Sequence, residues 1–308
     1  MSSGSVRVAG IDCGTNSIRL LVADVGPDFV ELDRRMQIIR LGEGVDRTGS
    51  LSAAALQRAF AACQEYADLI EEFGAQRVRF VATSASRDAS NAHEFADGVQ
   101  RILGVTPEVV TGEEEARLSF AGAMTGSGLP SPALVFDIGG GSTEFIRGAQ
   151  EPEVAVSVDM GCVRFTERFA SNDPMTPAEL AAIRTEVDRL LDQVEQSVPL
   201  RGAASLVGLA GTVTTVAGLA AGLTEYDSER IHLSTASAAA VEQVMTDLVG
   251  MSAAERAGLG IMHPGRADVI AAGAVILDQI VKRSGANEVT ASEHDILDGI
   301  AWSLAATV

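Results

Sequence analysis

The chain has 308 residues and a net charge of −19, and 46% of its residues are hydrophobic. This length suffices for a full core without disulfides or metals, and about 150 residues per domain predicts two domains. The acidic balance excludes a general nucleic-acid or anionic-membrane binder, which relies on basic surface. Lys282 is the only lysine, which excludes a P-loop NTPase, because that loop ends in lysine.

The cysteines and the N-terminus carry no signal for secretion. Cys13, Cys63 and Cys162 are widely spaced and form no CxxC pair. They fit a reducing cytosol, and no signal peptide is evident, so we expect a cytoplasmic protein. The uncharged stretch 202–224 is rich in glycine, alanine and threonine, which favours a strand, a turn and a helix over a membrane span.

The first half of the chain begins with strands and continues with alternating helices and short strands. Glycine and asparagine between the opening strands predict an antiparallel meander, and apolar residues at helical spacing predict a long helix thereafter. The predicted strands cover 5–12, 18–25, 29–41, 78–82 and 108–110, and the predicted helices cover 51–73, 91–103 and 113–124.

The second half repeats this order after a linker-like run at 126–132. Each half opens with a strand that ends in aspartate and is followed by a glycine turn. This repeat of about 130 residues is too long for a solenoid. It predicts two related α/β domains, at 1–125 and 126–292, with a cleft between them. The predicted strands here cover 133–137, 143–148, 154–158 and 205–209, and the predicted helices cover 163–170, 177–196, 212–221, 236–249, 266–284 and 294–306.

Two turns after the aspartate-ending strands are candidates for phosphate binding. The turn after Asp12 offers backbone N–H groups and hydroxyls, and Asp12 can orient a metal-bound water. In the turn after Asp137, three glycines let the backbone approach a polyanion, and Asp137 and Glu144 are oxygen ligands that suit Mg²⁺. Each turn alone is a weak signal, but the pair at equivalent places is a strong one. The predicted phosphate-binding residues are Gly14, Thr15, Asn16, Ser17, Gly139, Gly140, Gly141 and Ser142.

A third turn, GLAGTVT at 208–214, follows a strand and opens a helix. A helix N-terminus presents N–H groups to an anion, so Gly211 and Thr212 are further candidates. Taken alone, this turn is more simply explained as a helix start with Thr212 or Thr214 as its N-cap.

These segments resemble the exopolyphosphatase/guanosine pentaphosphatase (Ppx/GppA) family of the actin-like superfamily. The resemblance is carried, in family order, by GIDCGTNSIRLLV (10–22), IRLGEGVD (39–46), ATSASRDASN (82–91), TGEEEARLSFAGA (111–123), FDIGGGSTEF (136–145), GLAGTVTT (208–215) and HPGRADVIAAG (263–273). It implies an α/β fold of two duplicated actin-like (ribonuclease H-like) domains with an interdomain cleft. We also expect a C-terminal helix, over 293–308, to pack on the first domain.

The activity that the resemblance implies is Mg²⁺-dependent removal of terminal orthophosphate from inorganic polyphosphate, with Mn²⁺ as a substitute ion. Hydrolysis of guanosine pentaphosphate is an alternative, since both substrates present a terminal phosphoanhydride. A kinase or ATPase of the wider superfamily, and a weakly catalytic sensor that binds polyphosphate or guanosine penta- or tetraphosphate, are alternatives of other classes. The family further implies a homodimer, and neither a nucleic acid nor a membrane is an expected partner.

The resemblance also implies residue roles. Glu115, which precedes Ala116, corresponds to the general base that activates water, and Glu114 is its rival because three glutamates run together. The aspartates and the glutamate already named correspond to the metal site, and Arg87 and Arg266 to cations that line the phosphate path. From the residues alone, acidic side chains at 113–115 suit any helix start, and the segment around Arg87 also reads as a capped helix start.

The chain departs from the family pattern at 292–299, where Leu297 and Asp298 replace an arginine and a glutamate. If that arginine holds domains or phosphates, another group must do so here. The chain also ends at Val308, whereas longer members carry further helices, which predicts a preference for short polyphosphate. The net charge repels polyanions, so local arginines and Mg²⁺ must attract them within a Debye length of about 8 Å.

Overall fold

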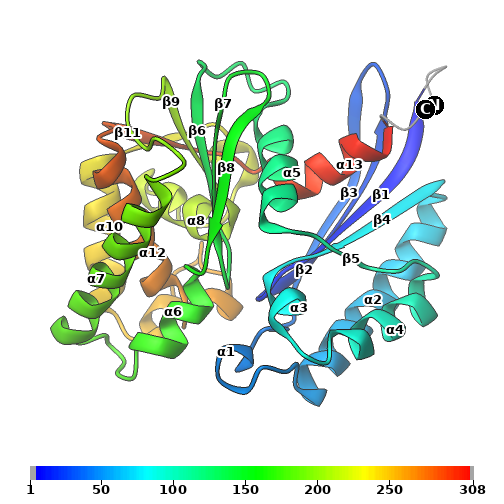
Figure 1. The fold of residues 1–308 in the computed structure, drawn as a ribbon, viewed down its shortest axis with the longest axis horizontal. Coiled ribbons are helices and arrows are strands. Elements are labelled where there is room, and N and C mark those ends of the chain that lie inside the picture. The colour runs from blue at the N-terminus through cyan, green and yellow to red at the C-terminus, as the bar shows by residue number, and fades with distance from the viewer. Residues whose placement is uncertain (1–4, 306–308) are drawn as a thin grey trace. The chain divides into compact units, whose positions relative to one another are not determined.

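The structure is a computed structural model that describes residues 5–305. The chain divides into two compact units. Unit 1 comprises Met1–Gly122 and Ile296–Val308, and unit 2 comprises Ala123–Asp295. Each unit contains one mixed β-sheet with helices packed on it (Figure 1).

Unit 1 contains a five-stranded sheet. Its strands are β1 (Val6–Cys13), β2 (Ser17–Val25), β3 (Phe29–Ile38), β4 (Arg77–Ala82) and β5 (Glu108–Val109). They lie in the order β3-β2-β1-β4-β5, and β4 and β5 run parallel to β1. The first three strands form an antiparallel meander, so the predicted meander is confirmed.

Side chains that alternate along these strands assign the two faces of the sheet to different helices. The helices of unit 1 are α1 (Val45–Thr48), α2 (Ala53–Phe73), α3 (Ser84–Asp88), α4 (Ala92–Leu103), α5 (Gly112–Met124) and α13 (Ile296–Ala305). Ala9 and Ile11 join the core beneath α2 and α4, whereas Val8 packs with Leu297 of α13. Gly10 lies directly against Ile300. The last helix therefore returns to cover the second face of the first sheet (Figure 1).

Unit 2 repeats this topology. Its strands are β6 (Ala133–Ile138), β7 (Thr143–Gly148), β8 (Pro152–Val158), β9 (Ser205–Leu209), β10 (Thr235–Ser237) and β11 (Glu288–Ala291). They lie in the order β10-β11-β9-β6-β7-β8; β6 to β8 form an antiparallel meander, and β9 and β11 run parallel to β6. Without the edge strand β10, this is the strand order of unit 1. The predicted duplication of an actin-like α/β domain is therefore confirmed.

One large apolar core joins the helices of unit 2 to its sheet. The helices are α6 (Cys162–Phe169), α7 (Pro177–Val194), α8 (Ala210–Ala220), α9 (Ser228–Ile231), α10 (Ala238–Gly250), α11 (Ala253–Ala257), the short 3₁₀ helix η1 (Pro264–Arg266) and α12 (Ile270–Ser284). Helix α12 packs against both α7 and α10 (Figure 1). The start of α7 is set by a capping box between Thr176 and Glu179, with proline at its first position.

Several predicted elements have different bounds in the structure. The strand predicted for 29–41 ends at Ile38, because Arg40 adopts a left-handed backbone with φ of 48°. The helix predicted for 236–249 begins only at Ala238, since the residues before it pair with β11. The helix predicted for 266–284 begins at Ile270, because a proline-initiated 3₁₀ turn precedes it.

Short elements account for most of the structure that the sequence did not predict. Strand β11 and helices α1, α9 and α11 are each at most five residues long, too short for a clear periodic pattern. The helix predicted for 294–306 covers 296–305, and residue 306 lies outside the described residues. The uncharged stretch 202–224 forms β9 and α8, and none of the helices within residues 5–305 is long and apolar enough to cross a membrane.

Candidate active site

The first predicted phosphate turn lies in unit 1 at the end of β1. Gly14 closes the turn by donating its N–H to the carbonyl of Ser17 at 2.9 Å. Asp12 is buried and lies opposite Arg19 of β2 in the sheet register. Arg19 donates to Oδ2 of Asp12 from Nε at 3.0 Å and from Nη2 at 2.7 Å. The carboxylate of Asp12 is therefore already neutralised by a guanidinium within its own sheet.

Neighbouring segments hold this turn in place. The carbonyl of Asn16 accepts N–H bonds from Ile39 and Arg40, and the carbonyl of Thr15 accepts one from Gly42. A side chain at Gly42 would begin 2.4 Å from the methyl group of Thr15, so only glycine permits this approach. Oγ1 of Thr15 also lies 2.8 Å from Oγ of Ser84, at the end of the adjacent parallel strand. Backbone and side-chain hydrogen bonds to neighbouring segments thus hold the turn in place.

Glu115, the predicted base, is paired with Arg87, a predicted phosphate ligand. Glu115 lies in the first turn of α5 and is only 8% exposed. Nη1 of Arg87 lies 3.1 Å from Oε2 of Glu115 and donates to the carbonyl of Val110 at 2.8 Å. Arg87 therefore holds the Glu115 carboxylate in a fixed place.

The other two glutamates of this run have different surroundings. The side chain of Glu113 is exposed and forms a helical i,i+4 pair with Arg117. The side chain of Glu114 is 41% exposed, and its Oε1 lies 3.5 Å from Nη2 of Arg79. Burial and fixed geometry therefore distinguish Glu115 from both neighbours.

The second predicted turn lies in unit 2, where two carboxylates face each other. Asp137 of β6 and Glu144 of β7 are directly opposite in the register and are 6% and 1% exposed. Oγ of Ser157, on β8, donates to Oε1 of Glu144 at 2.6 Å. Directly opposed residues have Cβ atoms about 5 Å apart, so two hard oxygen donors converge here. This donor set fits a divalent cation such as Mg²⁺, which accepts one or two carboxylates and keeps water ligands.

The glycine loop between these carboxylates has its carbonyls bonded and its amides available. Helix α6 donates backbone N–H groups to the carbonyls of Gly139 and Gly140, and Nε of Arg164 donates to the carbonyl of Gly141 at 2.7 Å. Within residues 5–305, the N–H groups of Gly140, Gly141 and Ser142 have no protein acceptor. A row of amides without a protein acceptor can donate to the oxygens of a phosphate.

The third turn opens α8 and lies at the end of a strand adjacent to β6. Asp137 and Leu209 are register partners of the parallel strands β6 and β9, so the second and third turns leave the same edge of the sheet. Ala210 has a left-handed backbone with φ of 65°, and no side chain caps the helix. Thr212 and Thr214 lie inside the helix, so the N-cap interpretation is wrong for both of them.

Arg266 packs on this third turn. A Cβ at Gly211 would lie 2.1 Å from Cζ of Arg266, so the guanidinium lies flat against the glycine. A Cβ at Gly273 of α12 would likewise meet Oγ1 of Thr212 at 2.7 Å. Close backbone approach therefore places Arg266, Gly211 and Thr212 together in unit 2.

The predicted site residues fall into two groups. Asp12, the first turn, Arg87 and Glu115 belong to unit 1, and Asp137, Glu144, the second and third turns and Arg266 belong to unit 2. Within residues 5–305 no three histidine, cysteine or acidic side chains gather as a metal site. Sequence reasoning missed Ser157 and Arg164, because their partners are 13 and 23 residues away.

The duplicated α/β topology, with glycine turns after corresponding strands, defines the actin-like fold class. The chain is a member of the Ppx/GppA phosphatase family, whose model matches residues 21–307. It is 46% identical to exopolyphosphatase 2 of Mycobacterium tuberculosis over 97% of this chain and 98% of that protein. A solved exopolyphosphatase-like protein shares 41% identity with a TM-score of 0.95, covering 98% of both chains. The Aquifex aeolicus family member shares 30% identity with a TM-score of 0.82, again covering 98% of both chains.

Proposed function

We propose that the protein is an exopolyphosphatase that releases terminal orthophosphate from inorganic polyphosphate with the help of Mg²⁺. The observation that carries this proposal is the buried Asp137–Glu144 pair beside three backbone amides that lack a protein acceptor. Phosphoryl transfer needs positioned donors and charge neutralisation more than covalent chemistry, and this is what the loop offers. The similarity to an exopolyphosphatase over nearly the full chain supports the same substrate class.

We assign the phosphate-binding step to the glycine loop and to Arg266. The amides of Gly140, Gly141 and Ser142 would donate to non-bridging oxygens of the transferred group, where negative charge accumulates. Asp137 and Glu144 would hold Mg²⁺, which when bound neutralises phosphate charge. Asp12 fits this role less well, because Arg19 already occupies its Oδ2.

We assign proton abstraction to Glu115. Its carboxylate would accept a proton from the attacking water as the P–O bond to the leaving phosphate breaks, giving orthophosphate and a chain shorter by one unit. The hydrogen bond from Arg87 orients the buried Glu115 carboxylate before the reaction, as a general base requires. The exposed Glu114 has no such support.

Orthophosphate release tests the function and the base together. We expect release from tripolyphosphate and longer polyphosphate with Mg²⁺, and weaker support by Mn²⁺. Glu115→Gln should lower kcat by about 10²- to 10⁴-fold, whereas the matched Glu114→Gln should stay within about threefold of the parent. Equal losses in both variants would overturn the choice of base. Orthophosphate release from guanosine pentaphosphate but not from polyphosphate would make guanosine pentaphosphate the substrate. Binding of polyphosphate without turnover would indicate a sensor.

We also propose that short polyphosphate is preferred. A polyanion held near a surface of net charge −19 meets repulsion that grows with the length of polymer held there. A series of defined chain lengths should therefore give the highest kcat/KM at the short end. Processive degradation of long chains as the preferred substrate would contradict this.

A further inference from the structure

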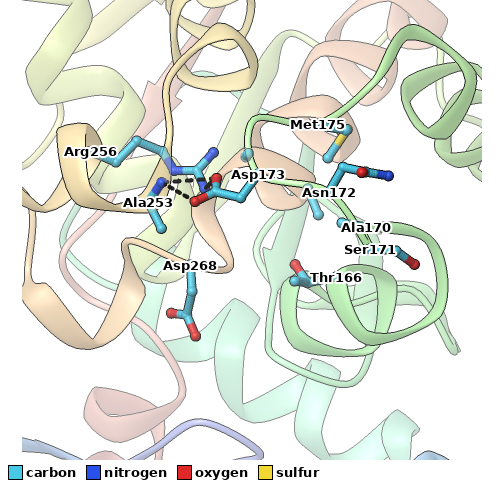
Figure 2. Close-up of a pocket in the computed structure, with 11 residues that line it drawn as sticks. Thr166, Ala170, Ser171, Asn172, Asp173, Met175, Ala253, Arg256 and Asp268 are labelled. Carbon is cyan, nitrogen blue, oxygen red and sulfur yellow. Dashed lines mark hydrogen bonds and ion pairs between the residues drawn. The ribbon is translucent and has the colours of Figure 1, made fainter.

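A buried guanidinium links the segments that carry the phosphate-binding groups of unit 2. Arg256 lies on α11 and is 4% exposed. Its Nε donates to the carbonyl of Ala267 at 2.7 Å, its Nη1 to the carbonyl of Leu248 at 3.0 Å, and its Nη2 lies 3.2 Å from Oδ1 of Asp173. Figure 2 shows this guanidinium against Asp173. None of these contacts involves a residue of the proposed site directly.

The contact with Ala267 fixes the segment that carries Arg266. Ala267 follows Arg266 in the chain, between the 3₁₀ turn η1 and the start of α12. The carbonyl of Arg266 itself accepts the N–H of Val269 at 3.0 Å, so this stretch is a tight connection. Anchoring the next carbonyl to a buried guanidinium therefore restricts the backbone from which the Arg266 side chain reaches Gly211.

The contact with Asp173 ties the same guanidinium to the glycine-loop side of the unit. Asp173 follows α6, whose N-terminus donates to the carbonyls of Gly139 and Gly140. Both carboxylate oxygens of Asp173 also accept the N–H of Ala253 at 2.9 Å, at the first turn of α11. Arg256 thus links the segment before α12, at Ala267, to the loop after α6, at Asp173.

Stability alone does not explain a buried charge at this position. Burial lowers the pKa of Arg256 despite the nearby carboxylates of Asp173 and Asp268, so desolvation is its largest electrostatic effect. A well-packed apolar side chain is often as stabilising as a buried ion pair, or more so. The fixed fork of a guanidinium does offer something an apolar residue lacks, namely three directed bonds to three separate segments.

We propose that Arg256 is a positioning residue that sets the place of Arg266, and through it the affinity for the phosphate chain. This inference rests on the proposed role of Arg266 in phosphate binding. Because Arg256 acts on binding and does not touch the reacting atoms, its loss should raise KM about tenfold and change kcat by less than about threefold.

A cavity beside Arg256 allows a direct test by chemical rescue. The cavity has a volume of about 230 Å³, and besides small side chains it is lined by Arg256, Asp173, Asp268, Asn172, Met175 and Thr166 (Figure 2). Arg256→Ala would extend this cavity and remove one donor from each of three acceptors. Guanidinium chloride, well below denaturing concentrations, should therefore lower the raised KM for tripolyphosphate part of the way to the parent value, whereas NaCl and urea at equal concentration should not.

A double-mutant cycle separates positioning from general stability. In an Arg266→Ala background, Arg256→Ala should add little to KM, because the residue through which it acts is gone. Arg147→Ala is the matched control, since Arg147 also donates to three carbonyls in unit 2, those of Pro199, Arg201 and Gly202. It should lower the Tm and leave KM unchanged.

Three outcomes would overturn the inference: the same rise in KM with and without Arg266, a lowered Tm with unchanged KM, or a rise in KM that guanidinium does not reduce. If Arg256→Ala fails to fold, Arg256→Lys serves in the cycle, because lysine keeps the charge without the three-way fork. An unchanged KM in Arg266→Ala alone would instead refute the role of Arg266, and absence of hydrolysis by the parent would refute the proposed function.

Discussion

At the scale of single residues, the two sheets use one position differently. Asp12 and Asp137 are the next-to-last residues of equivalent strands, and the residue seven positions later faces each of them in the register. In unit 1 that residue is Arg19, which neutralises its partner, and in unit 2 it is Glu144, which doubles the negative charge. The repeat therefore contains one pair of opposite charge and one pair of two carboxylates.

Ser157 should matter for the metal without touching it. Its hydroxyl donates to Glu144 at 2.6 Å and thereby orients the carboxylate. Removing a hydrogen-bond partner of a metal ligand typically lowers metal affinity by about 10- to 100-fold. We therefore expect Ser157→Ala to raise the Mg²⁺ concentration for half-maximal phosphate release by at least about tenfold. Thr185→Ala on the exposed side of α7 is the control. An unchanged Mg²⁺ requirement would remove Glu144 from the metal site.

His263 should make stability depend on pH. Partial desolvation and the charge of Arg266 lower its pKa, and its Nδ1 accepts the N–H of Gly265 at 3.1 Å. The folded protein thus binds this proton less tightly than the unfolded chain does, so stability is complete above the ordinary pKa of about 6.5 and declines as the pH falls below it. Thermal unfolding from pH 8 to 5 should show a steeper loss for the parent than for His263→Asn, which keeps a capping acceptor without a titrating ring. Parallel curves would contradict this assignment.

At the scale of elements, the packing of α13 against α5 in unit 1 depends on Gly299. A Cβ there would lie 2.0 Å from the carbonyl oxygen of Leu118 in α5, and backbone cannot yield as a side chain does. We expect Gly299→Ala to lower the free energy of unfolding by about 3 kcal/mol. Gly250→Ala, at the end of α10 with open space around it, should instead be neutral or stabilising by about 0.5 kcal/mol. Denaturant unfolding distinguishes the two, and equal effects would mean that α13 shifts without cost.

The same helix explains the departure from the family pattern at 297–298. Leu297 is fully buried with Val8 and Leu21, and Asp298 is 2% exposed and forms a pair with Arg34 of β3 at 2.7 Å. Arg34→Met should destabilise the protein by about 3 kcal/mol, because it removes a partner of a buried carboxylate. The double change Arg34→Met with Asp298→Leu should recover most of that loss. A single variant as stable as the parent, measured by thermal unfolding, would show that other contacts suffice for Asp298.

At the scale of the whole molecule, the net charge of −19 should shape the salt dependence. A basic protein that contacts six to ten phosphates of a nucleic acid loses about 10³- to 10⁵-fold in affinity between about 50 and 200 mM salt. Here salt screens both the attraction by local arginines and the repulsion by the acidic surface. We therefore expect KM for tripolyphosphate to change by less than about fivefold over that range. A hundredfold rise would mean that basic contacts dominate binding.

Much of the fold was predictable because its signals are local. Meanders with glycine turns, aspartates at strand ends and long amphipathic helices are each encoded within some 20 residues. The predicted α/β duplication was correct for this reason. Short elements such as β11 and α11 escaped, because five residues or fewer carry no reliable period and are held by their neighbours.

By itself, the sequence determined the duplicated α/β class, the family and the three candidate phosphate turns, since each depends on residues close together in the chain. Only the tertiary structure decided which glutamate of the run 113–115 is buried, because Arg87 lies 28 residues from Glu115. Only the tertiary structure joined Asp173, Arg256 and Ala267 as well, across up to 83 residues. Burial and ion pairing depend on distance in space, and no local pattern of residue types records that distance.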